Sequence, residues 1–303
     1  MTVRVGAVDL GTNSTRLLVA DVEDGAVREL ARRLRITRLG ESVDTRRKLL
    51  PTAIARVRNV LADYRRELES LGVDHTLAVA TSAVRDADNG EAFLGEVEWS
   101  YGFATRLLSG DEEAALTYRG VAAGRKVEPG TLIVDIGGGS TELILADRHA
   151  SLDVGCVRLT ERFGEDADAA GAYVAPLLPE WPVESGIGVA GTVTSLAALD
   201  LGLTEYDPAR VHGHVMGAAA VGEQLHRLAS LTLEERRALP GLEPDRAPVI
   251  VAGAAILREV VRRYGLDSVE ASEYDLLHGV ALAAAELPVR EEDAAPPGAF
   301  TCC

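Results

Sequence analysis

Apolar residues fall into short runs along the chain, and two pairs of these runs share one strand–turn–strand pattern. In the first pair a run ends at Asp9, a glycine-containing turn follows, and the next run begins near Thr15. The second pair occupies 131–136 and 142–147, with Asp135 in the corresponding place. Short apolar runs bounded by glycine and small polar residues are typical of β-hairpins.

The rest of the chain alternates between strand and helix patterns, which is typical of an α/β fold with mixed sheets. Residues 51–70 have helical spacing behind Pro51, a residue suited to a first helical turn. Residues 186–199 read as a strand, a glycine turn and a helix. We predict further strands within 27–36, 75–85, 103–108, 151–157 and 268–271, and further helices at 110–120, 215–229, 232–238, 245–264 and 274–286.

The two hairpins belong to an internal repeat. Residues 8–20 read VDLGTNSTRLLVA and residues 134–146 read VDIGGGSTELILA, so seven of thirteen positions are identical at an offset of 126 residues. Because the same setting recurs around both copies, a duplication explains the match better than chance does. A length of 303 residues suits two domains of about 150 residues each.

We place the domains on the basis of this repeat. The N-terminal domain is predicted at 1–122 and the C-terminal domain at 123–273. A helix at about 274–287 has a small, apolar face, so we expect it to pack back on the first domain. Residues 288–303 are polar and rich in proline, which predicts a disordered tail.

The net charge of −16 is concentrated in the second part of the chain. Residues 1–110 hold 16 Lys and Arg and 16 Asp and Glu, so residues 111–303 carry the whole excess of acid. No domain is strongly basic, which argues against nucleic acid as a partner. Charges beyond about 8 Å are largely screened at physiological salt, so nearby groups decide whether an anion binds.

Several protein classes are not expected. The chain has no run of about 18 apolar residues and no signal-peptide layout at its N-terminus, so we predict a cytoplasmic protein without a membrane span. Cys156, Cys302 and Cys303 form no disulfide framework and suit a reducing compartment. His212 and His214 would point to opposite faces of a strand, so a shared metal site is not expected there. A homodimer is compatible with the chain, since soluble enzymes commonly dimerise.

Asp9 and Asp135 each end a strand directly before a glycine turn. A carboxylate in that place can hold Mg²⁺ directly or through water, and glycines let backbone N–H groups approach a phosphate closely. An ordinary hairpin with a capping aspartate is the alternative, but the duplication favours two phosphate loops with a metal at Asp135 and Asp9. The expected phosphate contacts are Asn13, Ser14, Gly137, Gly138, Gly139, Ser140 and Thr141.

Two further places in the chain suit an anion. Gly191 and Thr192 follow an apolar strand and open a helix, whose N-terminus favours negative charge. A tight turn capped by Thr192 is an equally good interpretation. Arg85 lies just past a strand, where loops of α/β sheets meet ligands and an arginine can clamp a phosphate. An ordinary surface arginine is the equal alternative.

An acidic helix start lies at 109–113. If Ser109 is the N-cap, Glu112 at the third helical position completes a capping box and Glu113 is free to act as a general base. If Gly110 is the N-cap, the two glutamates exchange these roles. The spacing alone favours a third interpretation, in which the acids only complement the helix dipole.

Glu142 occupies the repeat position at which the first copy has Arg16. A second acid near Asp135 can orient water or a metal ion, and an exposed strand residue is the alternative of equal weight. The first domain also has a basic cluster that can steer a long anion, although a solvated surface is the simpler interpretation. Its members are Arg32, Arg33, Arg35, Arg38, Arg46, Arg47 and Lys48.

Taken together, these motifs resemble those of the exopolyphosphatase and guanosine pentaphosphate phosphohydrolase family (Ppx/GppA). The resemblance covers nearly the whole chain, and DIGGGSTEL combined with SGDEEA is highly specific. One departure is Ser42 after RLGE, where the family often has glycine. Another is that the chain stops near residue 303, whereas longer members carry extra C-terminal helical domains. The matching stretches are 7–19, 38–41, 80–89, 109–121, 133–143, 188–196, 212–214 and 240–257.

The resemblance implies a fold of the actin-like ATPase superfamily. It consists of two duplicated ribonuclease-H-like domains with mixed five-stranded sheets and a cleft between them. It also implies that Glu113 is the general base, in agreement with the first capping interpretation, and that Glu142 is a second catalytic acid. The remaining site residues implied are Asp9 and Asp135 for the metal, and Asn13, Ser14, Arg85, 137–141, Gly191 and Thr192 for phosphate.

The function implied by the resemblance is that of an exopolyphosphatase using Mg²⁺ or Mn²⁺. Such an enzyme removes the terminal phosphate of inorganic polyphosphate by hydrolysis. Hydrolysis of pppGpp to ppGpp on the same site is the first alternative. An ATP-dependent kinase of the superfamily and a binding protein without turnover are the others.

Overall fold

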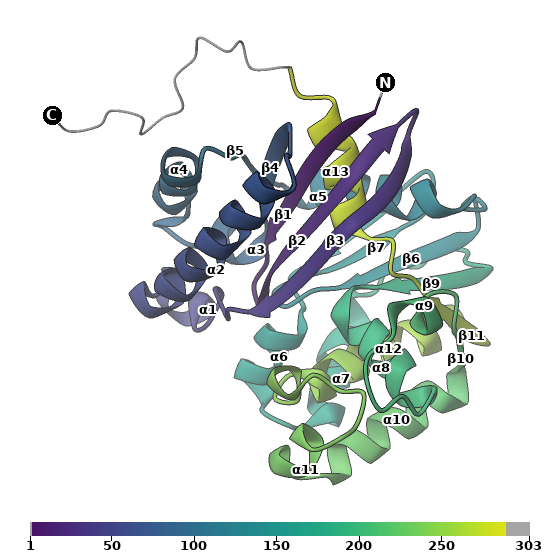
Figure 1. The fold of residues 1–303 in the computed structure, drawn as a ribbon. Helices are drawn as coiled ribbons and strands as arrows, with labels where there is room; N and C mark the ends of the chain where they lie inside the picture. Colours follow the sequence, from purple (N-terminus) through teal and green to yellow (C-terminus); the bar gives the residue numbers. More distant parts are fainter. Residues whose placement is uncertain (1, 289–303) are drawn as a thin grey trace, which may run out of the picture. The chain divides into compact units, whose positions relative to one another are not determined.

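The computed structural model describes residues 2–288, and these divide into two compact units (Figure 1). Unit 1 holds the chain up to Arg125 together with the segment from Leu276 onward, and unit 2 is Lys126–Asp275. The predicted tail at 288–303, apart from Pro288, and the cysteines Cys302 and Cys303 lie outside the described residues.

Unit 1 is built on a five-stranded mixed sheet with the strand order β3-β2-β1-β4-β5. The first three strands form an antiparallel meander, while β1, β4 and β5 run parallel. A parallel pair needs a crossover between its strands, and the helices provide it. The strands are β1 Val3–Leu10, β2 Ser14–Glu23, β3 Ala26–Ile36, β4 His75–Ala80 and β5 Ala104–Leu107.

Both faces of this sheet are buried, as the alternation along β1 shows. Val8 and Leu10 join a core with α2 and α4, while Val5 and Ala7 join a second core with α5 and α13. Successive strand residues point to opposite faces, so one apolar strand serves both cores. The helices are α1 Val43–Arg46, α2 Pro51–Ser70, α3 Ser82–Arg85, α4 Gly90–Tyr101, α5 Gly110–Gly124 and α13 Leu276–Ala285.

Helix α13 follows all of unit 2 in the chain, yet it packs in unit 1. Gly279 lies against the backbone of α5, where an added Cβ would be 1.9 Å from the carbonyl oxygen of Leu116. Only a glycine permits so close an approach between two helices. The buried His278 ring lies 2.9 Å from a carboxylate oxygen of Glu29 on β3, which adds a polar tie to the apolar packing.

Unit 2 repeats the same strand order and adds one strand. Its sheet runs β10-β11-β9-β6-β7-β8, so β6, β7, β8, β9 and β11 correspond to β1–β5 of unit 1. This match confirms the predicted α/β fold with two duplicated ribonuclease-H-like units. The strands are β6 Thr131–Ile136, β7 Thr141–Ile144, β8 His149–Leu152, β9 Ser185–Val189, β10 Val215–Gly217 and β11 Ser268–Ala271.

The prediction of five strands was wrong for this second sheet. The segment expected to begin a helix at residue 215 starts as β10, an edge strand antiparallel to β11. Met216 is buried between the exposed Val215 and Gly217, which is the alternation of a strand. Three residues are too few for this period to be recognised in sequence.

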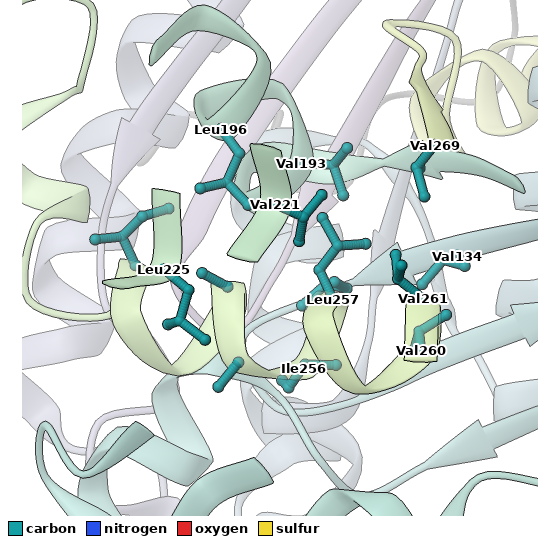
Figure 2. Close-up of a cluster of buried hydrophobic side chains, with 14 of the residues drawn as sticks. Val134, Val193, Leu196, Val221, Leu225, Ile256, Leu257, Val260, Val261 and Val269 are labelled. Carbon is teal, nitrogen blue, oxygen red and sulfur yellow. The ribbon is translucent and has the colours of Figure 1, made fainter. Parts of the chain in front are cut away.

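One helix organises the core of unit 2 (Figure 2). Helix α12 buries residues on every side, as expected for a central helix. Ile256 and Val260 pack there with Val193 and Leu196 of α8 and with Leu225 of α10. The helices are α6 Cys156–Phe163, α7 Ala167–Val174, α8 Ala190–Asp200, α9 Pro208–Val211, α10 Ala218–Ser230, α11 Leu233–Arg237 and α12 Ile250–Tyr264, with 3₁₀ turns η1 Ala175–Leu177 and η2 Pro244–Arg246.

The pattern missed the helices α1, α3, α4, α6, α7 and α9, and it placed β8 too late. Residues 151–157 were expected to form a strand, but β8 ends at Leu152 and α6 begins at Cys156. Within the described part of the chain, no helix combines the length and the apolar character needed to cross a membrane.

Candidate active site

The repeated hairpins close with the same backbone turn in both units. The N–H of Gly11 donates to the carbonyl of Ser14 at 3.0 Å, and the N–H of Gly137 donates to the carbonyl of Ser140 at 3.0 Å. A Cβ at Gly11 or Gly137 would lie only 3.0 or 3.1 Å from that acceptor oxygen. The shared turn therefore explains why glycine opens each loop.

The carbonyl groups of the second loop accept hydrogen bonds from α6. Gly137 accepts from the N–H of Cys156 at 3.0 Å, and Gly138 accepts from the next two N–H groups of the helix at 2.9 and 3.2 Å. The Gly139 carbonyl accepts from Nε of Arg158 at 2.8 Å. These bonds satisfy the first N–H groups of α6, which have no partner within the helix.

This arrangement leaves the N–H groups of the loop available. Among the described residues, the N–H groups of Gly138, Gly139 and Ser140 have no hydrogen-bond acceptor. Successive N–H groups in a turn whose carbonyls are engaged elsewhere form a concave anion site. The predicted phosphate contacts at 137–140 thus belong to a turn with the donor pattern that a phosphate needs.

In the first loop, residues 37–40 rather than a helix donate hydrogen bonds to the carbonyl groups. The Thr12 carbonyl accepts from the N–H of Gly40 at 2.8 Å, and the Asn13 carbonyl accepts from Thr37 and Arg38 at 3.0 and 2.9 Å. No acceptor for the N–H groups of Thr12 and Asn13 is found in the described chain, and the buried Nδ2 of Asn13 also has no partner there. A buried amide without a partner is costly unless a ligand satisfies it.

The carboxylates beside the two loops have different partners. Asp9 faces Arg16 across β1 and β2, and both Nε and Nη2 of Arg16 lie 2.8 Å from Oδ2 of Asp9. Asp135 faces Glu142 across β6 and β7. Asp135 is 6% exposed and Glu142 is 1% exposed. Unit 1 therefore pairs its aspartate with a cation, while unit 2 places two buried carboxylates opposite each other.

The pair in unit 2 fits a divalent cation. Two carboxylates at directly opposed strand positions repel each other when both are charged, and a bound Mg²⁺ or Mn²⁺ removes that repulsion. Carboxylate oxygens are the ligands that Mg²⁺ prefers, and it usually keeps waters or phosphate oxygens as well. Among the described residues no cluster of three or more His, Cys, Asp or Glu side chains has a metal-binding arrangement.

A hydroxyl group orients one of these carboxylates. Ser151 lies opposite Glu142 on β8, and its Oγ donates to Oε1 of Glu142 at 2.9 Å. Sequence reasoning did not find Ser151, because nothing near it in the chain indicates that it faces Glu142.

The start of α5 confirms the first capping interpretation. Ser109 is the N-cap and accepts from the N–H of Glu112 at 3.2 Å, while Glu112 accepts from the N–H of Ser109 at 2.9 Å. Glu113 is buried, and its Oε2 lies 3.4 Å from Nη1 of Arg85. Arg85 also donates to the carbonyl of Leu108 at 2.7 Å. The fold therefore brings the predicted base and the predicted phosphate-binding arginine together.

Gly191 and Thr192 lie at the start of α8 in a densely packed region. A Cβ at Gly191 would be 2.1 to 2.2 Å from the guanidinium of Arg246. Thr192 is 1% exposed and touches Gly253 of α12 and the thiol of Cys156. Burial raises the pKa of that thiol, which keeps it neutral. Arg246 was not singled out by its sequence, since 55 residues separate it from the glycine it covers.

Donor loops of one design in two duplicated units, each next to an aspartate, are typical of a protein that binds phosphate groups. Comparison with known proteins supports this class. The Ppx/GppA phosphatase family is matched by residues 18–287. The chain belongs to this family, which confirms the resemblance of its motifs and the predicted hydrolase class.

Individual relatives are similar over nearly the whole chain. Exopolyphosphatase 2 of Mycobacterium tuberculosis is 38% identical over 315 residues, covering 93% of this chain and 98% of the relative. An exopolyphosphatase-like crystal structure has a TM-score of 0.88 at 32% identity and covers 93% of this chain and 97% of its own. The Ppx/GppA enzyme of Aquifex aeolicus has a TM-score of 0.79 at 31% identity, with coverages of 93% and 100%.

Proposed function

We propose that this protein is a metal-dependent exopolyphosphatase. It would hydrolyse the terminal phosphoanhydride bond of inorganic polyphosphate and release orthophosphate. The observation that carries the proposal is the pair of glycine loops. Their carbonyl groups accept hydrogen bonds from neighbouring segments, which leaves N–H groups of the loops to donate to a phosphate. Two such loops in one chain suit a substrate that presents several phosphate groups. The similarity to a relative named exopolyphosphatase 2 over 93% of the chain supports the choice of substrate.

Glu113 is the general base of this proposal. Its neighbour Glu112 is held in the capping box and Asp111 is exposed, whereas Glu113 is buried beside Arg85, so we assign to Glu113 the acceptance of a proton from water. The water oxygen bonds to the terminal phosphorus, the bond from phosphorus to the bridging oxygen breaks, and the shortened chain leaves with the electron pair. Arg85 orients the Glu113 carboxylate and adds a positive charge for the phosphate oxygens.

Asp135 and Glu142 would hold Mg²⁺ or Mn²⁺, with Ser151 fixing the Glu142 carboxylate. When bound, the cation neutralises charge on the phosphate oxygens. The predicted metal role of Asp9 is secondary in this proposal, because Arg16 already contacts its Oδ2. The Arg16 contact instead suits Asp9 to a role in fixing the first loop. In that loop the N–H groups of Thr12 and Asn13 and the side-chain amide of Asn13 would donate to a phosphate.

Phosphate release from polyphosphate and from pppGpp, measured side by side, tests this function. We expect turnover of polyphosphate, and preferred release from pppGpp would establish the first alternative instead. Transfer of phosphate from ATP to an organic acceptor would indicate a kinase. Binding of polyphosphate without turnover at any Mg²⁺ or Mn²⁺ concentration would indicate a sensor.

Glu113→Gln tests the assignment of the base. We expect kcat to fall by about 10²–10⁴-fold, the usual contribution of a general base, with the unfolding temperature unchanged. Asp111→Asn is the matched control, because it removes the same charge from an exposed place on the same helix turn. Turnover near that of the wild type in Glu113→Gln, or an equal loss in Asp111→Asn, would contradict the assignment.

A further inference from the structure

Three consecutive cations in unit 1, Arg46, Arg47 and Lys48, are exposed. Their side chains make no hydrogen bond or ion pair with any described residue. Many other arginines of this unit are neutralised by a neighbouring carboxylate. Such pairs are Arg4–Asp21, Arg33–Glu67, Arg56–Glu41, Arg58–Glu96 and Arg66–Asp63.

The backbone that carries these cations is fixed. The Arg47 carbonyl accepts from the N–H of Asp88 at 2.7 Å. The Asn89 side chain both accepts from the N–H of Leu49 at 2.8 Å and donates to its carbonyl at 3.1 Å. The three cations are therefore presented by an ordered segment, and less freedom is lost when a ligand binds them.

The same segment adopts unusual backbone conformations. Arg38, Ser42 and Arg47 have φ values of 49°, 60° and 54°, which side chains other than glycine rarely adopt. Strained backbone persists only where the surroundings enforce it, and it gathers at ligand sites.

This segment, residues 38–48, follows β3 in the chain and contacts the first phosphate loop through its backbone. The N–H of Gly40 donates to Thr12 of that loop, and a Cβ at Gly40 would lie 2.3 Å from Cγ2 of Thr12 and 3.0 Å from Cβ of Ala83. Ala83 belongs to α3, the helix that ends at Arg85. The segment that carries the three cations thus contacts the elements of unit 1 that hold the predicted phosphate contacts.

We propose that Arg46, Arg47 and Lys48 bind internal phosphate groups of a linear polyphosphate, beyond the group that is cleaved. This inference rests on the proposed function and specifies its substrate as a chain of many phosphates. Such a chain carries regularly spaced charges and no other group to recognise, so a row of cations on a fixed backbone suits it. Tripolyphosphate and pppGpp have few phosphates beyond the one that is cleaved, so they can meet fewer of these cations. The acids nearest in sequence are Asp44 and Glu41, of which Glu41 binds Arg56, and Asp88 contacts Arg47 through its backbone N–H.

A triple variant, Arg46→Gln/Arg47→Asn/Lys48→Gln, tests the proposal. Asparagine is chosen at residue 47 because it tolerates a positive φ. For long-chain polyphosphate we expect KM and the dissociation constant to rise about 10-fold at low salt, with kcat unchanged. Three fewer phosphate contacts should also reduce the slope of log affinity against log salt by about 2. For tripolyphosphate, kcat/KM should stay within about twofold of the wild type.

The matched control is Arg28→Gln/Arg66→Gln/Lys126→Gln. It removes the same total charge from exposed places near the start of β3, near the end of α2 and just beyond the end of α5. This control should leave the binding of both substrates unchanged. The double variant Arg46→Gln/Lys48→Gln keeps the native residue at position 47, and it should give a smaller loss of the same kind if the triple variant is unstable.

Binding is measured separately from turnover, so that the two proposals fail in different ways. An unchanged dissociation constant for the long chain, or equal losses for the long chain and tripolyphosphate, would overturn the inference while the wild type still releases phosphate. A wild type that neither binds nor hydrolyses long-chain polyphosphate would overturn the proposed function and the inference together.

Discussion

The first and second phosphate loops share a backbone and differ in the side chains that surround it. Both close with a glycine N–H bonded to a serine carbonyl at 3.0 Å, and both have their carbonyls held from behind. Residues 37–40 support the first loop, whereas α6 supports the second. Across the strands Asp9 faces Arg16, but Asp135 faces Glu142.

This difference shows that the duplicated units share the backbone of the loop and differ in the side chain that faces the aspartate. The donor pattern depends only on the backbone turn, so it survived in both units while the sequences diverged. One difference, arginine against glutamate at the equivalent strand position, then decides whether a cationic or an anionic side chain faces the neighbouring aspartate. We infer that both loops bind phosphate and that the metal belongs to unit 2.

We expect the largest loss of activity from substitutions in the segments that support the two loops. Gly155→Ala places a Cβ 2.3 to 2.5 Å from backbone atoms of Gly138 and Gly139, which cannot move without displacing the second loop. We expect kcat/KM to fall about 100-fold and stability to fall by about 1–3 kcal/mol, as for an overpacked core. Steady-state kinetics and urea unfolding measure the two effects.

The corresponding change in unit 1 should cost less. Gly40→Ala meets side-chain atoms of Thr12 and Ala83 rather than the backbone of the first loop, so we expect a smaller displacement and about a 10-fold loss in kcat/KM. Gly222→Ala in α10 is the control, because a Cβ there meets nothing within 4 Å. It should leave activity intact and stabilise the helix by up to about 1 kcal/mol. Losses of equal size in all three variants would contradict the special role of the loop supports.

A smaller effect is expected where the two loops differ by one side chain. Asn13 corresponds to Gly139, and its buried Nδ2 has no partner among the described residues. If this amide donates to phosphate, Asn13→Gly should raise KM for polyphosphate about 10-fold, since one hydrogen bond to a charged group is lost. Gly95→Ala, at a helical position in unit 1 where an added Cβ has no close neighbour, is the control. A KM that does not change in Asn13→Gly would exclude the amide as a contact.

Local patterns in the sequence predict much of the fold. Helix α2 occupies 51–70 as expected, because Pro51 fixes its start and its apolar spacing is regular. The capping box at Ser109 follows from a four-residue motif and is formed in the structure. These features depend on residues close together in the chain, so the sequence alone contains the information.

Other features depend on contacts between distant residues and were missed. The start of α6 at Cys156 is fixed by hydrogen bonds to the carbonyls of Gly137 and Gly138. Arg246 meets Gly191 only after α12 has packed against α8. Ser151 reaches Glu142 through strand register. The roles assigned to the site residues stay predictions that the proposed variants test.

Binding of Mn²⁺ to the protein, measured by calorimetry without substrate, tests the central claim most directly. We expect Asp135→Asn to weaken the affinity at least about 100-fold, since it removes one of the two carboxylates of the site. Asp9→Asn should leave the affinity within about threefold, because the Arg16 guanidinium at Oδ2 already balances the charge of that carboxylate. An equal loss in both variants, or a loss only in Asp9→Asn, would contradict the assignment of the metal to unit 2.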